Sequence, residues 1–138
     1  MGNSQTQVDD NERAREQAEI QLESVIEMVR ALEAAEKTDN DDTREEALQA
    51  ISEDPLEVSI RSGWYAPGTG HEAHHYKILL CTGGPAVRII GELTEHDEPG
   101  NAQLEYQDWF TPWIEYPLND EQQNFLVKYA SCFYFVDG

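Results

Sequence analysis

The stretch over residues 76–93, YKILLCTGGPAVRIIGEL, constrains the fold of this 138-residue chain more than any other. It holds two apolar runs joined by TGGP at residues 82–85, and glycine and proline are the residues that tight reversals need. No other part of the sequence is apolar enough to form the middle of a sheet. The stretch therefore predicts a central β-hairpin on which the remaining elements pack.

The sequence before this hairpin has a helical pattern. Over residues 11–37, apolar residues recur at intervals of three and four, which is the period of one helix face. A polar break at residues 37–43 precedes a second, shorter helix. We expect the two helices to form an acidic antiparallel hairpin over residues 11–53, after a disordered polar tail over residues 1–10.

From Leu56 the period changes to two, since apolar and polar residues alternate in the next segment, and residues 56–138 are predicted to form a sheet and a C-terminal helix. A first strand leads to a loop at residues 65–75, and a fourth strand at residues 102–107 follows the central hairpin. Asn119 can cap a final helix. We therefore predict an α+β fold in a single domain over residues 11–138, with an N-terminal helical hairpin, a four-stranded antiparallel β-meander and a C-terminal helix.

The chain is strongly acidic, with 28 acidic against 9 basic residues and a net charge of −19. Solubility alone needs a net charge of only about 2–8. Duplex DNA carries the same charge in about 32 Å of its length. Such a field opposes direct binding to nucleic acid and to anionic membranes, and it favours basic macromolecular partners.

The location of the protein is predicted from two absences in the sequence. No apolar run approaches the roughly 20 residues that cross a bilayer, and the N-terminus lacks an apolar signal core. Cys81 and Cys132 lie in apolar surroundings, as reduced core thiols do. We expect a cytoplasmic protein, and the resemblance given below implies that its host is bacterial.

Twelve residues form the predicted partner-binding set. Five glutamates share the helix side opposite the apolar stripe and place a charge about every 5–6 Å along it. A turn adds three acidic residues, and an aromatic segment adds anchors of the type that dominates interface hot spots. The set is Glu12, Glu16, Glu19, Glu23, Glu27, Glu95, Asp97, Glu98, Asp108, Trp109, Phe110 and Trp113. A solvated helix surface and ordinary aromatic packing are the alternative explanations.

His71, His74 and His75 are candidate metal ligands, because imidazole with a nearby carboxylate suits zinc or nickel. The spacing H-E-x-H-H differs from the H-E-x-x-H of zinc-binding helices, and nearby glycines oppose a helix, so a solvated loop is favoured. No cofactor is predicted. Nothing places a nucleophile beside a base, and we expect no enzymatic activity.

Four segments carry a resemblance to a known group of proteins: IRSGW (60–64), the central stretch (76–93), LEYQDW (104–109) and TPW (111–113). They resemble small acidic proteins carried by phages, plasmids and integrated elements of proteobacteria. The likeness covers about residues 47–138, although the histidine loop and Phe110 depart from the group's pattern. The resemblance implies a shared fold and an association with inhibitors of host defence, such as anti-CRISPR and anti-restriction proteins that imitate nucleic acid.

The functional prediction joins this resemblance to the charge. We expect a non-enzymatic inhibitor that binds a basic, nucleic-acid-handling defence protein or ribonucleoprotein of the host by nucleic-acid mimicry. Two alternatives stay open. One is a small-ligand or metal-binding module that uses the loop at residues 71–75, and the other is a structural homodimer through the apolar stripe of the first helix.

Overall fold

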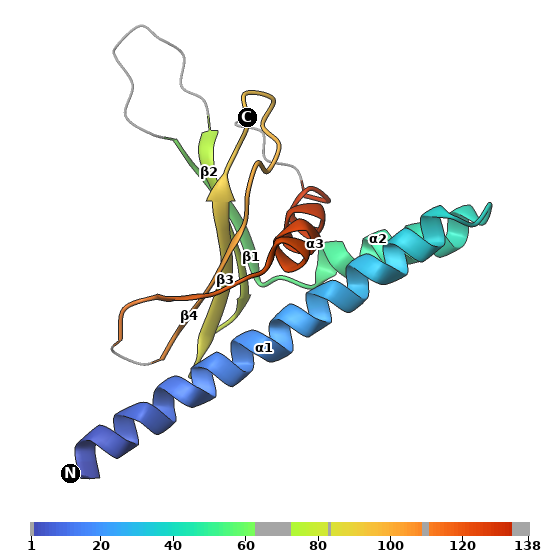
Figure 1. Cartoon of the computed structure of the whole chain (residues 1–138). Coiled ribbons are helices and arrows are strands. Elements are labelled where there is room, and N and C mark those ends of the chain that lie inside the picture. Colours follow the sequence, from blue (N-terminus) through green and yellow to red (C-terminus); the bar gives the residue numbers. More distant parts are fainter. Residues whose placement is uncertain (1, 63–72, 83, 109–110, 134–138) are drawn as a thin grey trace, which may run out of the picture.

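The fold is an antiparallel sheet with its helices packed on one face (Figure 1). The computed structural model describes residues 2–62, 73–82, 84–108 and 111–133. The sheet order is β1-β2-β3-β4-β5. The elements in chain order are α1 (Gly2–Glu36), α2 (Asp41–Glu53), β1 (Glu57–Ser62), β2 (Ala73–Cys81), β3 (Ala86–Glu92), β4 (Gln103–Gln107), β5 (Ile114–Tyr116) and α3 (Asp120–Ala130). The predicted α+β class is confirmed.

The sheet has five strands, so the prediction of four was one short. The additional strand, β5, pairs Ile114 with Tyr106 and Tyr116 with Leu104 of β4. It has only three residues and lies between two prolines, a context typical of loops. Pairing with β4, and an edge-on contact of the Tyr106 and Tyr116 rings at 6.5 Å, hold it in the sheet.

The loop predicted at residues 65–75 ends earlier than expected, because β2 starts at Ala73. Within β2, His75 pairs with Arg61 on one side and with Glu92 on the other. Two histidines of the predicted solvated loop therefore belong to a strand. Residues 63–72 lie outside the described part of the chain.

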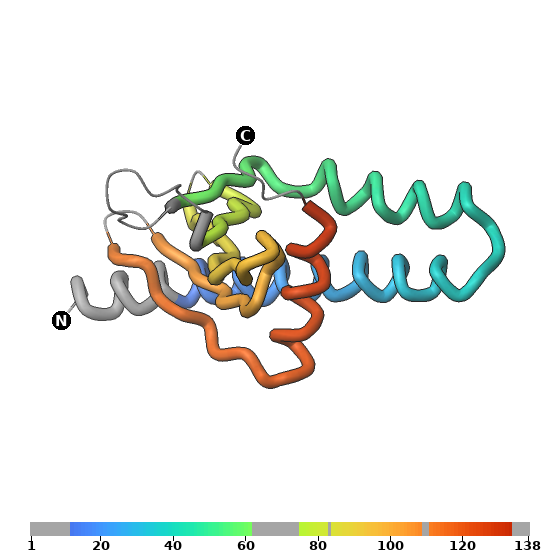
Figure 2. The backbone as a smooth tube through the Cα atoms, turned by 90° about the horizontal axis from the view of Figure 1, so that it is seen from above, coloured from blue at the N-terminus to red at the C-terminus, as the bar shows by residue number. Residues whose placement is uncertain are grey.

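The helices match the predicted hairpin only roughly. α1 begins at Gly2, so residues 2–10 continue a helix where a disordered tail was expected. α2 is much shorter than α1 and runs antiparallel beside its C-terminal part (Figure 2). Its N-cap is Asn40, whose side chain accepts hydrogen bonds from the Asp42 and Thr43 amides.

The cap predicted for the last helix is confirmed. The Asn119 side chain accepts a hydrogen bond from the Gln122 amide at 2.7 Å, and the Gln122 side chain accepts one from the Asn119 amide at 3.0 Å. This reciprocal pair is a capping box, which satisfies amides that the first turn of a helix leaves without partners.

The core lies between one face of the sheet and the helices. α1 contacts β3, β4 and α3 through its apolar stripe, which is buried as the sequence predicted. Burial of each large aliphatic side chain stabilises the fold by about 1.5–3 kcal/mol. The principal core residues are Ala14, Ala18, Leu22, Val25, Val29, Leu32, Ile51, Tyr76, Ile78, Leu80, Val87, Ile89, Ala102, Leu104, Tyr106, Leu126, Tyr129 and Ala130. The opposite face of the sheet carries none of the helices.

One close approach in the sheet requires a glycine. Tyr76 of β2 lies opposite Gly91 of β3, and the Tyr76 hydroxyl donates a hydrogen bond to the Asn101 carbonyl oxygen. A Cβ atom at position 91 would lie 2.6 Å from Cε1 of Tyr76 and still closer to that carbonyl oxygen. Only glycine leaves room for the ring and its hydrogen bond.

The Gly91→Ala variant is therefore expected to be destabilised by about 1–3 kcal/mol, the usual cost of overpacking a core. Urea unfolding followed by circular dichroism measures the change. Gly100→Ala is the matched control, because its added Cβ would come no closer than 3.3 Å to any neighbour. Equal stability of the two variants would contradict the packing of Tyr76 over Gly91.

A second prediction concerns alkaline pH. Burial raises the pKa of Tyr76 and of Tyr129, and the Tyr129 hydroxyl also donates a 2.7 Å hydrogen bond to the Asp54 carboxylate. The folded chain thus holds both hydroxyl protons more tightly than the unfolded chain. The two protonated tyrosines therefore contribute to the free energy of unfolding below about pH 10, and this contribution is lost as the pH rises further. Urea midpoints from pH 8 to pH 11 measure the loss. Tyr129→Phe should show a smaller loss, and an unchanged one would contradict the account.

Candidate functional site

The five predicted glutamates of α1 form the first charged surface, the acidic row: Glu12, Glu16, Glu19, Glu23 and Glu27. All five are exposed. They lie on the outer side of α1, away from the buried stripe, and Glu19 at the edge of this side reaches Tyr116 of β5. The row spans about 22 Å along the helix axis. Its geometry agrees with the sequence prediction.

The negative charges of the acidic row are not neutralised by ion pairs within the described part of the chain. Among the described residues, no ion pair joins any of the five glutamates to a lysine, arginine or histidine. Two nearby arginines of α1 lie over aromatic rings instead, Arg15 at 5.7 Å from the Tyr116 ring and Arg30 at 5.3 Å from the Phe125 ring. The Glu19 carboxylate accepts a hydrogen bond from the Tyr116 hydroxyl at 3.1 Å.

The connection between α1 and α2 forms a second acidic cluster, the hairpin tip, over residues 33–46. It holds seven acidic against two basic residues. The acidic members are Glu33, Glu36, Asp39, Asp41, Asp42, Glu45 and Glu46. Arg44 pairs with Asp41 at 2.6 Å, and Lys128 of α3 lies 3.1 Å from Glu36. The tip extends beyond α3 and the sheet (Figures 1 and 2).

The prediction missed the hairpin tip as a site. Its sequence signal was the run KTDNDDTREE over residues 37–46, of which residues 37–43 were interpreted as a polar break rich in capping residues. The break lies where it was predicted, but the cap differs: Asp41 or Asp42 was expected to cap the second helix, whereas Asn40 is the N-cap of α2 and both aspartates lie in its first turn. The remaining charges of the run are exposed, and they adjoin the end of the acidic row.

The predicted turn residues Glu95, Asp97 and Glu98 lie apart from the acidic row. They connect β3 to β4, and Figure 1 places this turn at the end of the sheet away from α1. The Thr94 amide donates to the Glu98 carbonyl oxygen at 2.7 Å, which closes the turn, and Asp97 takes a left-handed conformation with φ of 60°. The three acidic residues of this turn are therefore not part of one continuous surface with the acidic row.

The aromatic segment also lies apart from the acidic row. Trp109 and Phe110 are outside the described residues, and the Asp108 backbone is engaged by Thr111. The Trp113 ring lies 3.9 Å from the Arg88 guanidinium carbon. Because Arg88 alternates with buried residues of β3, Trp113 belongs to the open face of the sheet. Trp113 and the glutamates of the acidic row, which the sequence analysis placed in one partner-binding set, therefore lie on different faces of the protein.

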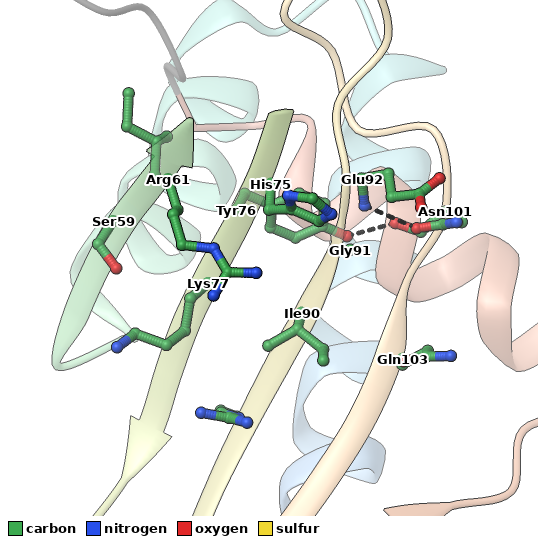
Figure 3. Close-up of a pocket in the computed structure, with 12 residues that line it drawn as sticks. Ser59, Arg61, His75, Tyr76, Lys77, Ile90, Gly91, Glu92, Asn101 and Gln103 are labelled. Atoms are coloured by element: carbon green, nitrogen blue, oxygen red, sulfur yellow. Dashed lines mark hydrogen bonds between the residues drawn. The ribbon is translucent and has the colours of Figure 1, made fainter. Parts of the chain in front are cut away.

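The open face of the sheet carries a surface that the sequence did not predict, the basic groove. After Glu57 the chain has four basic residues, and three of them, Arg61, Lys77 and Arg88, line this groove. Its cavity volume is about 600 Å³ (Figure 3). Arg88 is paired with Glu105 at 2.7 Å. The sequence indicated that these three side chains share a sheet face, because each alternates with apolar residues of its strand. Their proximity to one another follows only from the register of the strands.

The metal hypothesis gains no geometric support from the described residues. His71 and the side chain of His74 lie outside them, while His75 is half-buried, with an Nδ1 atom that is buried and lacks a hydrogen-bond partner there. No three His, Cys, Asp or Glu residues of the described chain gather as metal ligands would. Cys81 and Cys132 are both free, and burial raises the pKa of each thiol.

No model of a known protein family, no curated protein and no solved structure matches this chain. The resemblance to small acidic proteins of mobile elements stays a prediction from the sequence.

Within the described residues, none of the helices combines the length and the apolar character needed to cross a membrane.

The uncompensated acidic row makes a prediction about salt. Raising NaCl from about 0.01 M to about 1 M shortens the Debye length from about 30 Å to about 3 Å and screens self-repulsion, so the thermal midpoint should rise. The triple variant Glu16→Gln, Glu19→Gln and Glu23→Gln should have a higher midpoint than the unaltered chain at low salt. Calorimetry at both salt concentrations measures this. A lower midpoint would mean that basic side chains of the protein already neutralise the row.

Proposed function

We propose that this protein is a non-enzymatic inhibitor that binds a basic, nucleic-acid-handling protein by presenting carboxylates in place of phosphates. The observation that carries the proposal is the acidic row, with five exposed carboxylates on one helix side and no ion pair to a described cation. The resemblance to small acidic proteins of phages and mobile elements supports a host defence protein, such as a restriction or CRISPR nuclease, as the target.

The spacing of the charges supports mimicry of one nucleic-acid strand. Five carboxylates occupy about 22 Å of α1. One strand of B-DNA carries about six phosphates over that length, since its charges recur every 3.4 Å of axis. The hairpin tip continues the negative surface beyond Glu27 with seven further acidic residues. A groove that accommodates a phosphate backbone would meet a comparable line of charge.

An exposed apolar side chain lies beside the acidic row. Ile20 is 58% exposed, between Glu16 and Glu23 on the helix surface. Charged contacts accelerate and orient association, whereas buried apolar contacts supply much of the affinity of an interface. Ile20 thus takes the anchoring role that the sequence assigned to the aromatic segment. The interface we propose is the outer side of α1 together with the hairpin tip.

The homodimer alternative depended on the apolar stripe of α1. That stripe lies in the core of a single chain, with Ala14, Ala18, Val25 and Val29 at 0% exposure. A dimer through it would require α1 to leave the sheet and lose this burial, at a cost of about 1.5–3 kcal/mol for each large side chain. An inhibitor that uses the outer side of α1 requires no such opening.

The test uses the immobilised chain and a proteobacterial lysate. At low salt it is expected to retain nucleic-acid-binding proteins, and both duplex DNA and salt of about 0.2 M or more should release them, because phosphate-type contacts depend steeply on salt. The triple variant Glu16→Gln, Glu19→Gln and Glu23→Gln should lose this retention. Mass spectrometry of the eluates identifies what is retained.

The matched control removes the same charge elsewhere, with Glu57→Gln, Glu115→Gln and Glu121→Gln, all exposed positions outside the acidic row. This variant should retain the same proteins as the unaltered chain. Mimicry by the row is wrong if both variants lose retention equally, if neither does, or if duplex DNA fails to displace the retained proteins.

A further inference from the structure

We propose that the basic groove on the open face of the sheet binds a small organic anion through its carboxylate or phosphate oxygens. This site is separate from the acidic row, which lies on the helical side of the sheet, and the proposal does not depend on the inhibitor function. It starts from the position of the cations, since the described residues after Glu57 hold only four basic side chains and three of them line one groove.

The strand register brings these cations together. Arg61 pairs with His75, and Ser59 pairs with Lys77, so Arg61 and Lys77 are diagonal neighbours on the open face. Diagonal neighbours across two strands are about 7–8 Å apart, close enough for two long side chains to hold one anion between them. Lys77 also pairs with Ile90, which pairs in turn with Gln103. The middle of the groove is therefore a row of serine, lysine, isoleucine and glutamine.

Two of the three cations have no carboxylate partner among the described residues, namely Arg61 and Lys77. Arg88 differs, because it pairs with Glu105 and lies against Trp113. Two neighbouring cations that have no carboxylate partner in the described part of the chain repel each other. An anion between them would replace this repulsion with charge-assisted hydrogen bonds.

The shape and lining of the groove favour a small ligand. Its volume of about 600 Å³ falls within the range of small-molecule sites, about 300–1,000 Å³. Figure 3 shows Ser59, Arg61 and Lys77 on one side, Glu92, Asn101 and Gln103 on the other, and Ile90 between them. Ile90 offers an apolar surface to the body of the ligand, and the amides on the far side offer hydrogen bonds to its polar groups.

The charge of the whole molecule selects against large anions. Long-range repulsion from a net charge of −19 grows with the charge of the ligand, so a nucleic acid or an acidic protein is opposed far more than a monoanion or dianion. Glu92 acts in the same direction at close range, because it lies beside His75 on the open face, where an extended polyanion would meet its carboxylate. A small anion that reaches only Arg61 and Lys77 reduces the long-range repulsion and avoids the contact with Glu92.

The experiment titrates the ¹⁵N-labelled full chain at constant ionic strength, with inorganic phosphate in one arm and succinate in the other. Saturable shifts of the Ser59, Lys77, Ile90 and Gln103 amides are expected in at least one arm, and the arm with the tighter binding identifies the phosphate or carboxylate class. Arg61→Gln with Lys77→Gln should weaken binding by about tenfold or more, because both charged donors are lost. Lys77→Arg should retain binding.

The matched control is Arg13→Gln with Lys37→Gln, which removes one arginine and one lysine from exposed positions of the helical hairpin. It should bind like the unaltered chain, and circular dichroism checks that every variant is folded. The proposal is overturned if neither anion produces saturable shifts at the groove, if the control weakens binding as much as the groove variant, or if duplex DNA or polyglutamate occupies the groove more tightly than either small anion.

Discussion

The burial of the apolar stripe of α1 on one face of the sheet determines where every other feature lies. Val25 and Val29 are fully buried, and α1 contacts β3, β4 and α3. Because a helix has one apolar stripe and a strand has two faces, this contact turns the acidic row outward and leaves the second face of the sheet without a helix among the described elements. Both charged surfaces are consequences of that one packing arrangement.

The sheet separates the acidic row from the groove cations, although Glu57 and Glu92 also lie on the open face. The acidic row and the hairpin tip lie on the helical side, while Arg61 and Lys77, which have no carboxylate partner among the described residues, lie on the open side. Such separation keeps the groove cations out of ion pairs with the row. It also explains how a protein with a net charge of −19 can carry a local site for an anion, because short-range contacts with two cations act within a few ångströms while the opposing field is spread over the surface.

Local patterns in the sequence predicted the elements whose structure depends on residues close together in the chain. The spacing in α1 predicted its buried stripe and its exposed glutamates, and Asn119 predicted the start of α3. Pairing with distant residues decided the rest. The three residues of β5 have no strand signal until β4 lies beside them, and the strand that includes His75 depends on β1 and β3.

The same limit applies to the candidate sites. The acidic row could be predicted because its members share one helix, whereas Arg61, Lys77 and Arg88 come from three strands and meet only through register. The place of Trp113 could not be predicted for a related reason, since its ring lies over Arg88, 25 residues earlier in the chain. The charge composition predicted basic macromolecular partners. The distribution of the charged side chains between the helical side and the open face of the sheet could be known only from the fold.

The measurement that tests this account most directly maps the charge around the folded chain with soluble nitroxide probes of opposite sign, observed through paramagnetic broadening of its amide resonances. The separation of charges predicts that a cationic nitroxide broadens residues of the acidic row and the hairpin tip most strongly, while an anionic nitroxide gathers at Ser59 and Lys77 on the open face. Equal broadening patterns for the two probes, or the anionic probe excluded from the open face, would contradict the central claim that the sheet divides this protein into a negative and a locally positive side.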